Sequence, residues 1–147
     1  MSILVTGGRG KTSSRLSALL HDAEIPFVVA SRSQDTTSPY QQAHFDWSDE
    51  NTYRKLLEST PIRAAYLVPP PTSDLVDRLR DFIDQARSHG VNRFVLLSAS
   101  PLEAGGPAQG QIHDYLLSLD VEYVVLRPTW FQGEYSRLTV GLCLASD

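Results

Sequence analysis

The sequence predicts an α/β fold in which helices pack on a parallel sheet, and three observations support this prediction. Short apolar runs alternate with segments in which apolar residues recur at helical spacing. A glycine-rich turn lies between the first apolar run and the first helical segment. Polar residues or prolines follow several later runs, where parallel strands would end at one common edge. Because this alternation requires right-handed crossovers, we predict a Rossmann-type doubly wound parallel sheet of six strands in the order 3-2-1-4-5-6.

The first half of the chain is expected to hold three strands and two helices. The strands are the apolar runs at residues 3–6, 27–30 and 43–45. The first helix follows the glycine turn and ends near Glu24, and its buried face is expected to carry Leu16, Leu19 and Leu20. The second helix, which Ser48 or Asp49 is placed to cap, is expected to bury Tyr53, Leu56 and Leu57.

The second half is expected to hold three more strands, at residues 64–68, 93–97 and 122–126. Thr72 or Ser73 is placed to cap the third helix, and Gly90 to end it. Its first turn is expected to contain Asp74 and Asp77, and its buried stripe Leu75, Leu79, Phe82, Ile83 and Ala86. A glycine-rich loop at 103–110 precedes a fourth helix with the apolar residues Ile112, Tyr115, Leu116 and Leu119.

The glycine turn is typical of a dinucleotide-binding unit. Gly7 and Gly10 have the spacing of a G-x-x-G motif, although Ser13 stands where a third glycine is usual. Such glycines allow the backbone to approach a pyrophosphate, and the helix N-terminus faces the anion. We therefore predict that the cofactor contacts this segment, through Gly7, Gly8, Arg9, Gly10, Lys11, Thr12 and Ser13. The alternative is a tight turn without a ligand; a phosphate-loop ATPase is excluded because Val5 occupies the position of the first required glycine.

The end of the second strand indicates which dinucleotide is bound. An NAD-preferring unit places an acidic residue there, whereas this sequence has Arg32 between two serines. A guanidinium fits a phosphate on the ribose, so the predicted cofactor is NADP(H). The alternative is an ordinary solvated arginine.

Other segments are predicted to lie at the same edge. Val68, Pro69 and Pro70 follow the fourth strand, where they are expected to form a stiff wall against the cofactor, or alternatively only to stop the chain before a helix. Ser98 follows the fifth strand and is a further predicted cofactor contact, or alternatively a cap of the strand end. Residues 127–129 follow the sixth strand.

Composition excludes several function classes. The net charge of −4 disfavours nucleic acid binding, and no apolar stretch approaches membrane length. The single cysteine and the absence of a signal peptide predict a reducing, cytoplasmic setting. The four histidines lack metal-ligand spacing, so no metal is expected.

Six segments together resemble one family, the NmrA-like atypical short-chain dehydrogenases, and within it the fungal festuclavine/agroclavine dehydrogenases of ergot-alkaloid biosynthesis. These segments are residues 6–12, 29–33, 45–47, 67–71, 93–100 and 126–131. The resemblance implies an NADPH-dependent oxidoreductase that reduces the cyclic iminium derived from chanoclavine-I aldehyde, an indole alkaloid, to agroclavine or festuclavine. In some members a glutathione adduct is thought to assist iminium formation. Because NmrA-like proteins include regulators, a non-enzymatic NADP(H)-binding module is the alternative.

The resemblance covers residues 1–131, the predicted NADP(H)-binding domain, and ends there. Family members are about twice as long, and residues 132–147 do not resemble their continuation. We therefore expect a truncated product with a foreign tail, weakly active or inactive, rather than a genuine short protein.

Catalytic residues remain unassigned by the sequence. The Tyr-x-x-x-Lys pair of ordinary short-chain dehydrogenases is absent, since Leu119 stands four positions after Tyr115. An iminium is already cationic, so its reduction forms no oxyanion that would require a proton donor. Ser98, Tyr115 and Trp130 are the candidates to line the nicotinamide side.

Overall fold

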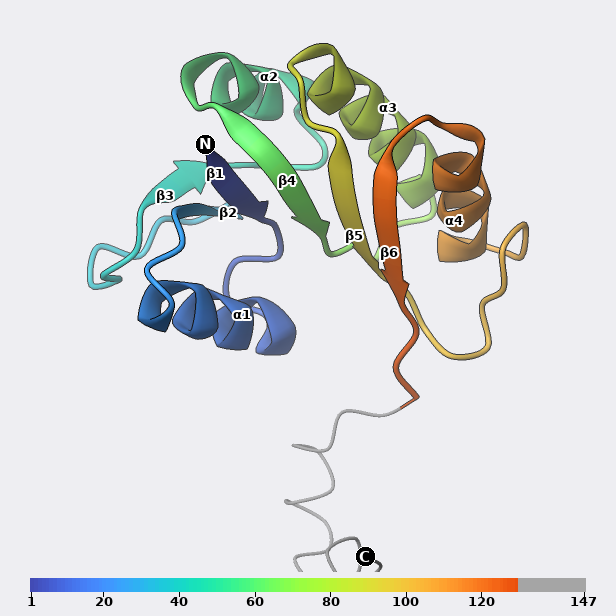
Figure 1. Ribbon diagram of the computed structural model, residues 1–147, viewed down its shortest axis with the longest axis horizontal. Helices are drawn as coiled ribbons and strands as arrows, with labels where there is room; N and C mark the ends of the chain where they lie inside the picture. Colours follow the sequence, from blue (N-terminus) through green and yellow to red (C-terminus); the bar gives the residue numbers. More distant parts are fainter. Residues whose placement is uncertain (130–147) are drawn as a thin grey trace, which may run out of the picture.

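The computed structural model describes residues 1–129, which form a six-stranded parallel sheet with four helices (Figure 1). Trp130, Phe131 and the predicted tail 132–147 lie outside the described residues. The strands are β1 (Ser2–Val5), β2 (Phe27–Ser31), β3 (Gln42–His44), β4 (Ile62–Leu67), β5 (Arg93–Leu97) and β6 (Glu122–Leu126). The helices are α1 (Lys11–Asp22), α2 (Glu50–Ser59), α3 (Leu75–Ser88) and α4 (Gln109–Ser118).

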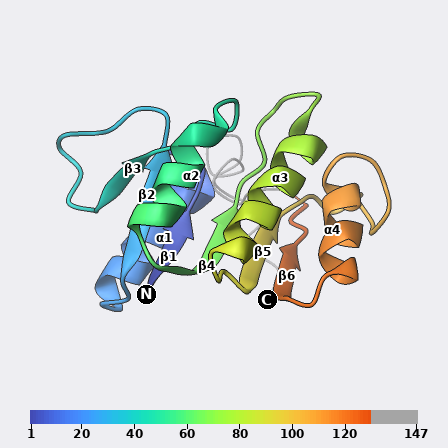
Figure 2. The same ribbon diagram turned by 90° about the horizontal axis from the view of Figure 1, so that it is seen from above.

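The strand order is β3-β2-β1-β4-β5-β6, and every neighbouring pair is parallel, as Figure 2 shows from above. The predicted Rossmann-type fold and strand order are confirmed. The order reverses at β1 and β4, which are neighbours in the sheet although a whole crossover separates them in the chain. Ligands of open α/β sheets bind outside the strand ends at such a point.

The helices divide unequally between the two faces of the sheet. Helices α2, α3 and α4 cover one face, and their core centres on Phe82 and Phe94, which are fully buried (Figure 1). Within the described part of the chain, only α1 covers the other face, where it packs over the β1–β2 side. Helix α1 does not cover Val124 and Leu126 of β6, whose side chains are 51% and 42% exposed.

Helix α1 buries a face that only partly matches the prediction, since Leu20 is buried and Leu16 is partly buried against the core on this side. Ser13, Ser17 and Leu20 are buried, whereas Leu19 is 67% exposed. The small serines allow the first turns of the helix to lie close to the sheet, and the Ser13 hydroxyl donates to the Thr6 carbonyl at 2.7 Å. Helical spacing of leucines did not reveal this face because close packing here selects small side chains rather than apolar ones.

The ends of α2 and α3 show which caps form. Asp49 caps α2, as predicted, by accepting a hydrogen bond from the Asn51 N–H. The prediction of Thr72 or Ser73 for α3 is wrong: Asp74 holds the N-cap position, and its carboxylate accepts from Arg78 instead of capping the helix. The other end of α3 follows the prediction closely, because Gly90 adopts φ +88° directly after the C-cap residue His89.

Thr6 joins the end of β1 to the end of β4 through its side chain. Its buried Oγ1 donates to the Tyr66 carbonyl at 2.9 Å and accepts from the Val68 N–H at 2.8 Å. The hydroxyl thus holds the chain that enters the glycine turn against the chain that leads to the prolines.

Replacing Thr6 with valine is expected to destabilise the protein by about 1–3 kcal/mol, because the Val68 N–H loses its buried acceptor while the side-chain volume is kept. Urea unfolding at equilibrium measures this loss. The matched control is Thr36→Val at an exposed position, which we expect to change stability by about 0.5 kcal/mol or less. Equal stability of the two variants would show that the Thr6 hydrogen bonds contribute nothing.

Candidate functional site

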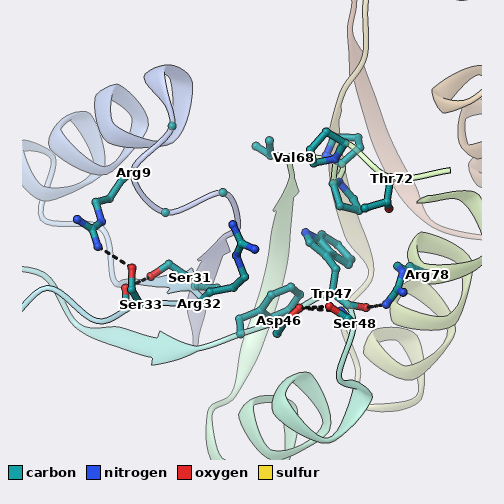
Figure 3. Close-up of a pocket in the computed structure, with 18 residues that line it drawn as sticks. Arg9, Ser31, Arg32, Ser33, Asp46, Trp47, Ser48, Val68, Thr72 and Arg78 are labelled. Atoms are coloured by element: carbon teal, nitrogen blue, oxygen red, sulfur yellow. Dashed lines mark hydrogen bonds between the residues drawn. The ribbon is translucent and has the colours of Figure 1, made fainter. Parts of the chain in front are cut away.

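A pocket of about 530 Å³ opens at the carboxyl ends of β1, β2 and β4 (Figure 3). The predicted cofactor residues among its lining are Gly7, Gly8, Arg9, Gly10, Arg32, Val68, Pro69 and Pro70. These residues come from three segments that are far apart in the sequence. We call this cavity the rim pocket. It lies at the reversal point of the strand order, where the sequence predicts the dinucleotide.

The glycine turn forms one wall of the rim pocket, and its glycines are required for two different reasons. Gly7 adopts φ +75°, a left-handed conformation that other residues rarely tolerate. Gly8 has no such constraint, but a Cβ there would lie 2.5 Å from the Cβ of Ser31. A Cβ on Gly10 would lie 3.0 Å from the Gly7 carbonyl oxygen. The turn is therefore held close to β2 by the lack of side chains.

The N-terminus of α1 follows this turn and is suited to an anion. Its N-cap residue is Gly10, which offers no side chain to satisfy the first N–H groups of the helix. The N–H of Gly10 itself donates to the Gly7 carbonyl at 2.7 Å, which closes the turn. Backbone N–H groups at a helix start, together with the helix dipole, stabilise a phosphate. These features fit the pyrophosphate of a dinucleotide.

Arginines from two segments stand at the end of β2. Arg32 extends into the rim pocket beneath the glycine turn, whereas Arg9 points away from the middle of the pocket toward Ser33 (Figure 3). The Arg9 guanidinium donates to the Ser33 hydroxyl at 2.6 Å. The Arg32 backbone is held by His44, whose Nδ1 lies 3.0 Å from the Arg32 carbonyl oxygen. The described lining of the rim pocket thus presents positive charge where a ribose would lie.

The wall opposite the glycine turn contains the predicted prolines. Val68, Pro69 and Pro70 are half-buried and line the rim pocket, and Thr6 fixes the start of this wall through the Val68 N–H. Prolines have no N–H and restrict their own backbone. The wall is therefore stiff and apolar, which suits a flat ring better than a phosphate.

Residues 45–48 and Arg78 also line the rim pocket, and the sequence did not identify them as site residues. Trp47 packs against Phe45 and Phe82, with ring centroids 4.8 and 5.5 Å apart, and its carbonyl accepts from Arg78 at 2.6 Å. Hydrogen bonds from Ser48 lower the pKa of Asp46, so this carboxyl is ionised at neutral pH. Residues 45–48 follow β3 and could have been found by the strand-end rule. No sequence pattern indicated Arg78 as a site residue, because it reaches the rim pocket from within α3 and not from the end of a strand.

Four of the predicted cofactor residues do not line the rim pocket. Lys11 is exposed on α1, and the Thr12 hydroxyl accepts from Tyr66 at 3.0 Å. The Ser13 hydroxyl is directed to β1, as described above. Ser98 follows β5; its hydroxyl is buried and has no hydrogen-bond partner in the described part of the chain. Their contact with a cofactor remains a prediction.

Tyr115 is directed elsewhere than expected. Its hydroxyl donates to the Asp84 carboxylate at 2.5 Å, and the Arg80 guanidinium lies 5.1 Å from its ring centroid. These contacts turn the side chain toward α3, outside the rim pocket. Trp130, the other aromatic candidate for the nicotinamide side, lies outside the described residues.

Comparison with known proteins identifies relatives, although no family model matches the chain. Festuclavine synthase II of Penicillium roqueforti is 50% identical over 138 residues, which cover 89% of this chain and 48% of that protein. Festuclavine dehydrogenase of Aspergillus fumigatus is 53% identical over 89% of this chain and 48% of its own length. Agroclavine dehydrogenase of Claviceps fusiformis is 46% identical, with 92% of this chain and 49% of that protein covered.

This chain is a relative of the festuclavine and agroclavine dehydrogenases. The resemblance inferred from the six segments is confirmed, and this relative spans about half the length of the proteins that it matches.

Solved structures confirm the fold. The triphenylmethane reductase of Citrobacter, solved with NADP(H), superimposes with a TM-score of 0.75 at 17% identity and covers 92% of this chain and 52% of its own. The yeast methylglyoxal/isovaleraldehyde reductase, solved with NADPH, has a TM-score of 0.71 at 16% identity over 88% of this chain and 55% of its own. Within residues 1–129, no helix has the length and apolar character needed to cross a membrane.

Proposed function

We propose that this clavine-dehydrogenase relative is the nucleotide-binding part of an NADPH-dependent oxidoreductase that acts on a C–N bond. The observation that carries the proposal is the rim pocket, which gathers eight predicted cofactor residues in a chain about half identical to clavine-forming enzymes. The proposed substrate is the cyclic iminium derived from chanoclavine-I aldehyde, and the product is agroclavine or festuclavine. The names of the relatives support this substrate class.

The residues of the rim pocket fit NADPH by the chemistry that they present. The glycine turn and the start of α1 would hold the pyrophosphate, because they offer backbone N–H groups and close approach. Arg32 would pair with the phosphate on the ribose. The apolar proline wall would pack against the cofactor and exclude water. When bound, NADPH supplies a hydride to an acceptor carbon.

The proposed substrate matches the absence of a tyrosine–lysine pair. Hydride addition to an iminium carbon shifts the C=N electron pair onto nitrogen, and the product is a neutral amine. No proton is transferred in this step, so the chain needs only to position the two reactants and exclude water. We further propose that the enzyme is cytoplasmic. We also propose that a glutathione adduct of the aldehyde assists formation of the iminium that the enzyme reduces.

A non-enzymatic NADP(H)-binding module is the second candidate. It is favoured by the rim pocket, because eight of the residues that line this pocket are predicted to bind a nucleotide. Turnover distinguishes the two candidates, since a binding module would bind NADPH and leave the iminium unchanged.

The chain alone is expected to reduce the iminium about 100-fold more slowly than a full-length relative, or not at all, because hydride transfer also requires a precisely held acceptor. The described residues supply the nucleotide side of the site, whereas the relatives are about twice as long. The experiment measures NADPH oxidation with the iminium, beside a chimera that carries a relative's remaining half. An active chimera supports the enzyme, and an inactive chimera that binds NADPH supports the binding module. Equal rates for chain and chimera would contradict the expected need for the second half.

A further inference from the structure

Strands β5 and β6 have an apolar surface on the α1 side of the sheet that no described helix covers (Figure 1). On this side β5 presents Val95 and Leu97, and β6 presents Val124 and Leu126 beside them in register. Val95 and Leu97 are partly buried, whereas Val124 and Leu126 are exposed. We call these four residues the uncovered face. They form one patch across two neighbouring strands, and such a patch marks a surface that another segment or molecule covers.

One flank of α1 is directed toward the uncovered face. The Thr12 hydroxyl accepts a hydrogen bond from Tyr66 of β4, so this flank of the helix faces β4. Leu19 lies seven positions after Thr12, which places it on the same flank two turns along the helix. The other flank carries His21, whose ring lies 5.4 Å from that of Tyr40, before β3. The exposed Leu19 therefore adds an apolar side chain on the side of α1 where the uncovered face lies.

The charges next to the uncovered face are already paired. Arg93 and Glu122 lie two residues before Val95 and Val124, on the same side of the two strands, and they form an ion pair with each other. The four residues of the uncovered face itself are all aliphatic. Burial of aliphatic side chains is the contact that such a surface offers, and a charged group buried there would lose its hydration. An occupant must therefore be apolar and uncharged.

Residues 138–144 of the same chain have this chemistry. Leu138, Val140, Leu142 and Leu144 alternate with small or polar residues, and no charged residue occurs from 138 to 146. Alternate side chains of an extended segment lie on one side, so this segment can present four aliphatic side chains together. The segment lies outside the described residues, and its sequence is the evidence for its chemistry.

The length of the intervening chain allows residues 138–144 to reach the uncovered face. The described chain continues past the end of β6 at Leu126 to Thr129, and residues 130–137 then separate Thr129 from Leu138. Eight extended residues span at most about 26–29 Å, whereas the five residues of β6 rise about 16 Å. The chain can therefore turn back along β6. Because the segment is covalently linked, its effective concentration at the face is in the millimolar range, which favours it over a second copy of the chain.

We propose that residues 138–144 dock on the uncovered face, with the aliphatic side of the segment against Val124 and Leu126. The contact removes these two side chains from water and shields them from a second copy of the chain. The inference goes beyond the proposed function and does not depend on it, because no residue of the uncovered face lines the rim pocket. It gives the last part of the chain a structural role of its own.

Disulfide trapping in the full chain tests the contact directly. Leu142→Cys and Val124→Cys are combined with Cys143→Ser, which removes the natural thiol. We expect a disulfide between positions 142 and 124 within one chain, because docked side chains lie within bonding distance. The matched control pairs Leu142→Cys with Glu58→Cys, an exposed position on α2 over the opposite face of the sheet, and should cross-link about tenfold more slowly or not at all. Equal rates for the two pairs, or a disulfide that joins two chains, would overturn the proposal.

Thermal unfolding of full-length variants measures what the contact contributes. Leu142→Asp is expected to lower Tm by about 5 °C, because it places a charge against aliphatic side chains, whereas Thr139→Asp, on the other side of the alternation, should lower Tm by about 1 °C or less. Val124→Ala should lower Tm more in the unchanged chain than in the Leu142→Asp chain, since the latter has lost the contact. Leu117→Ala, at an equally exposed position on α4, should shift both chains alike. Equal effects of the two aspartates, or additive effects of Val124→Ala and Leu142→Asp, would contradict the docking.

Discussion

Gly8→Val is expected to reduce NADPH binding by at least about 100-fold, because any side chain at this position displaces the glycine turn. A Cβ on Gly8 would lie 2.5 Å from the Ser31 Cβ, far inside contact distance, and Gly8 is buried. To relieve this clash, the turn must move away from β2, which also breaks the hydrogen bond from the Gly8 N–H to the Ala30 carbonyl at 3.3 Å. Fluorescence titration with NADPH measures the loss.

The matched control is Gly90→Ala, which separates lost binding from lost stability. Gly90 adopts φ +88°, and no atom lies near its Cβ direction, so alanine there strains the backbone by about 1–2 kcal/mol. The position is at the end of α3, away from the rim pocket. We expect this variant to bind NADPH normally at temperatures where it is folded. A folded Gly8→Val that binds NADPH with unchanged affinity would place the phosphate site elsewhere.

Gly10→Val, at the second glycine of the G-x-x-G motif, is expected to reduce NADPH binding less than Gly8→Val. A Cβ on Gly10 would be 3.0 Å from the Gly7 carbonyl oxygen, so the backbone there would have to shift by only a few tenths of an ångström. The spacing of the motif does not show at which of the two glycines a side chain is tolerated less, because the clash at Gly8 comes from Ser31 at the end of β2.

Arg32→Ala is expected to lower the affinity for NADPH tenfold to a hundredfold and to leave the affinity for NADH nearly unchanged. Arg32 lines the rim pocket at the end of β2, where an acidic residue would favour NADH, and a charge-assisted hydrogen bond to phosphate is among the stronger polar contacts. Parallel titrations with both dinucleotides measure the change in preference. The effect should shrink as salt is added, since the side chain is exposed.

Arg63→Ala is the matched control for this change in charge. Arg63 is exposed at the start of β4, at the opposite edge of the sheet from the rim pocket. Its loss should leave the affinities for both dinucleotides unchanged. An equal loss of NADPH and NADH affinity in Arg32→Ala would mean that Arg32 contacts a part that both cofactors share, and the predicted preference would then be wrong.

The order and direction of the strands were predictable from local patterns. Strands β2 and β4 are short apolar runs that are largely buried, and Ser31 and Pro69 stand at or just beyond their ends. Right-handed crossovers then leave few arrangements of six parallel strands. The positions of the strand ends in the sequence therefore also predicted that Gly7, Arg32 and Val68 lie at one edge of the sheet, where they line the rim pocket.

The faces of the helices were only partly predictable. The stripe of α3 buries Leu79, Phe82 and Ile83 as expected, because this helix meets the broad apolar face of the sheet. Helix α1 instead buries Ser13 and Ser17, because it begins in the turn and must lie close to the strands. Helical periodicity identifies the apolar residues that a helix buries. It does not identify small polar residues that are buried because the helix lies close to the sheet.

The sequence by itself determined the fold class, the strand order and the edge at which a dinucleotide would bind, because these follow from patterns within single segments. Only the tertiary structure decided which partners the individual side chains contact. It brought Arg9 to Ser33, Trp47 to Arg78 and Thr6 to Val68, and it turned Tyr115 toward Asp84. Each of these contacts joins segments at least 24 positions apart in the chain. Such pairings depend on the packing distances between elements, which no local pattern of residues specifies.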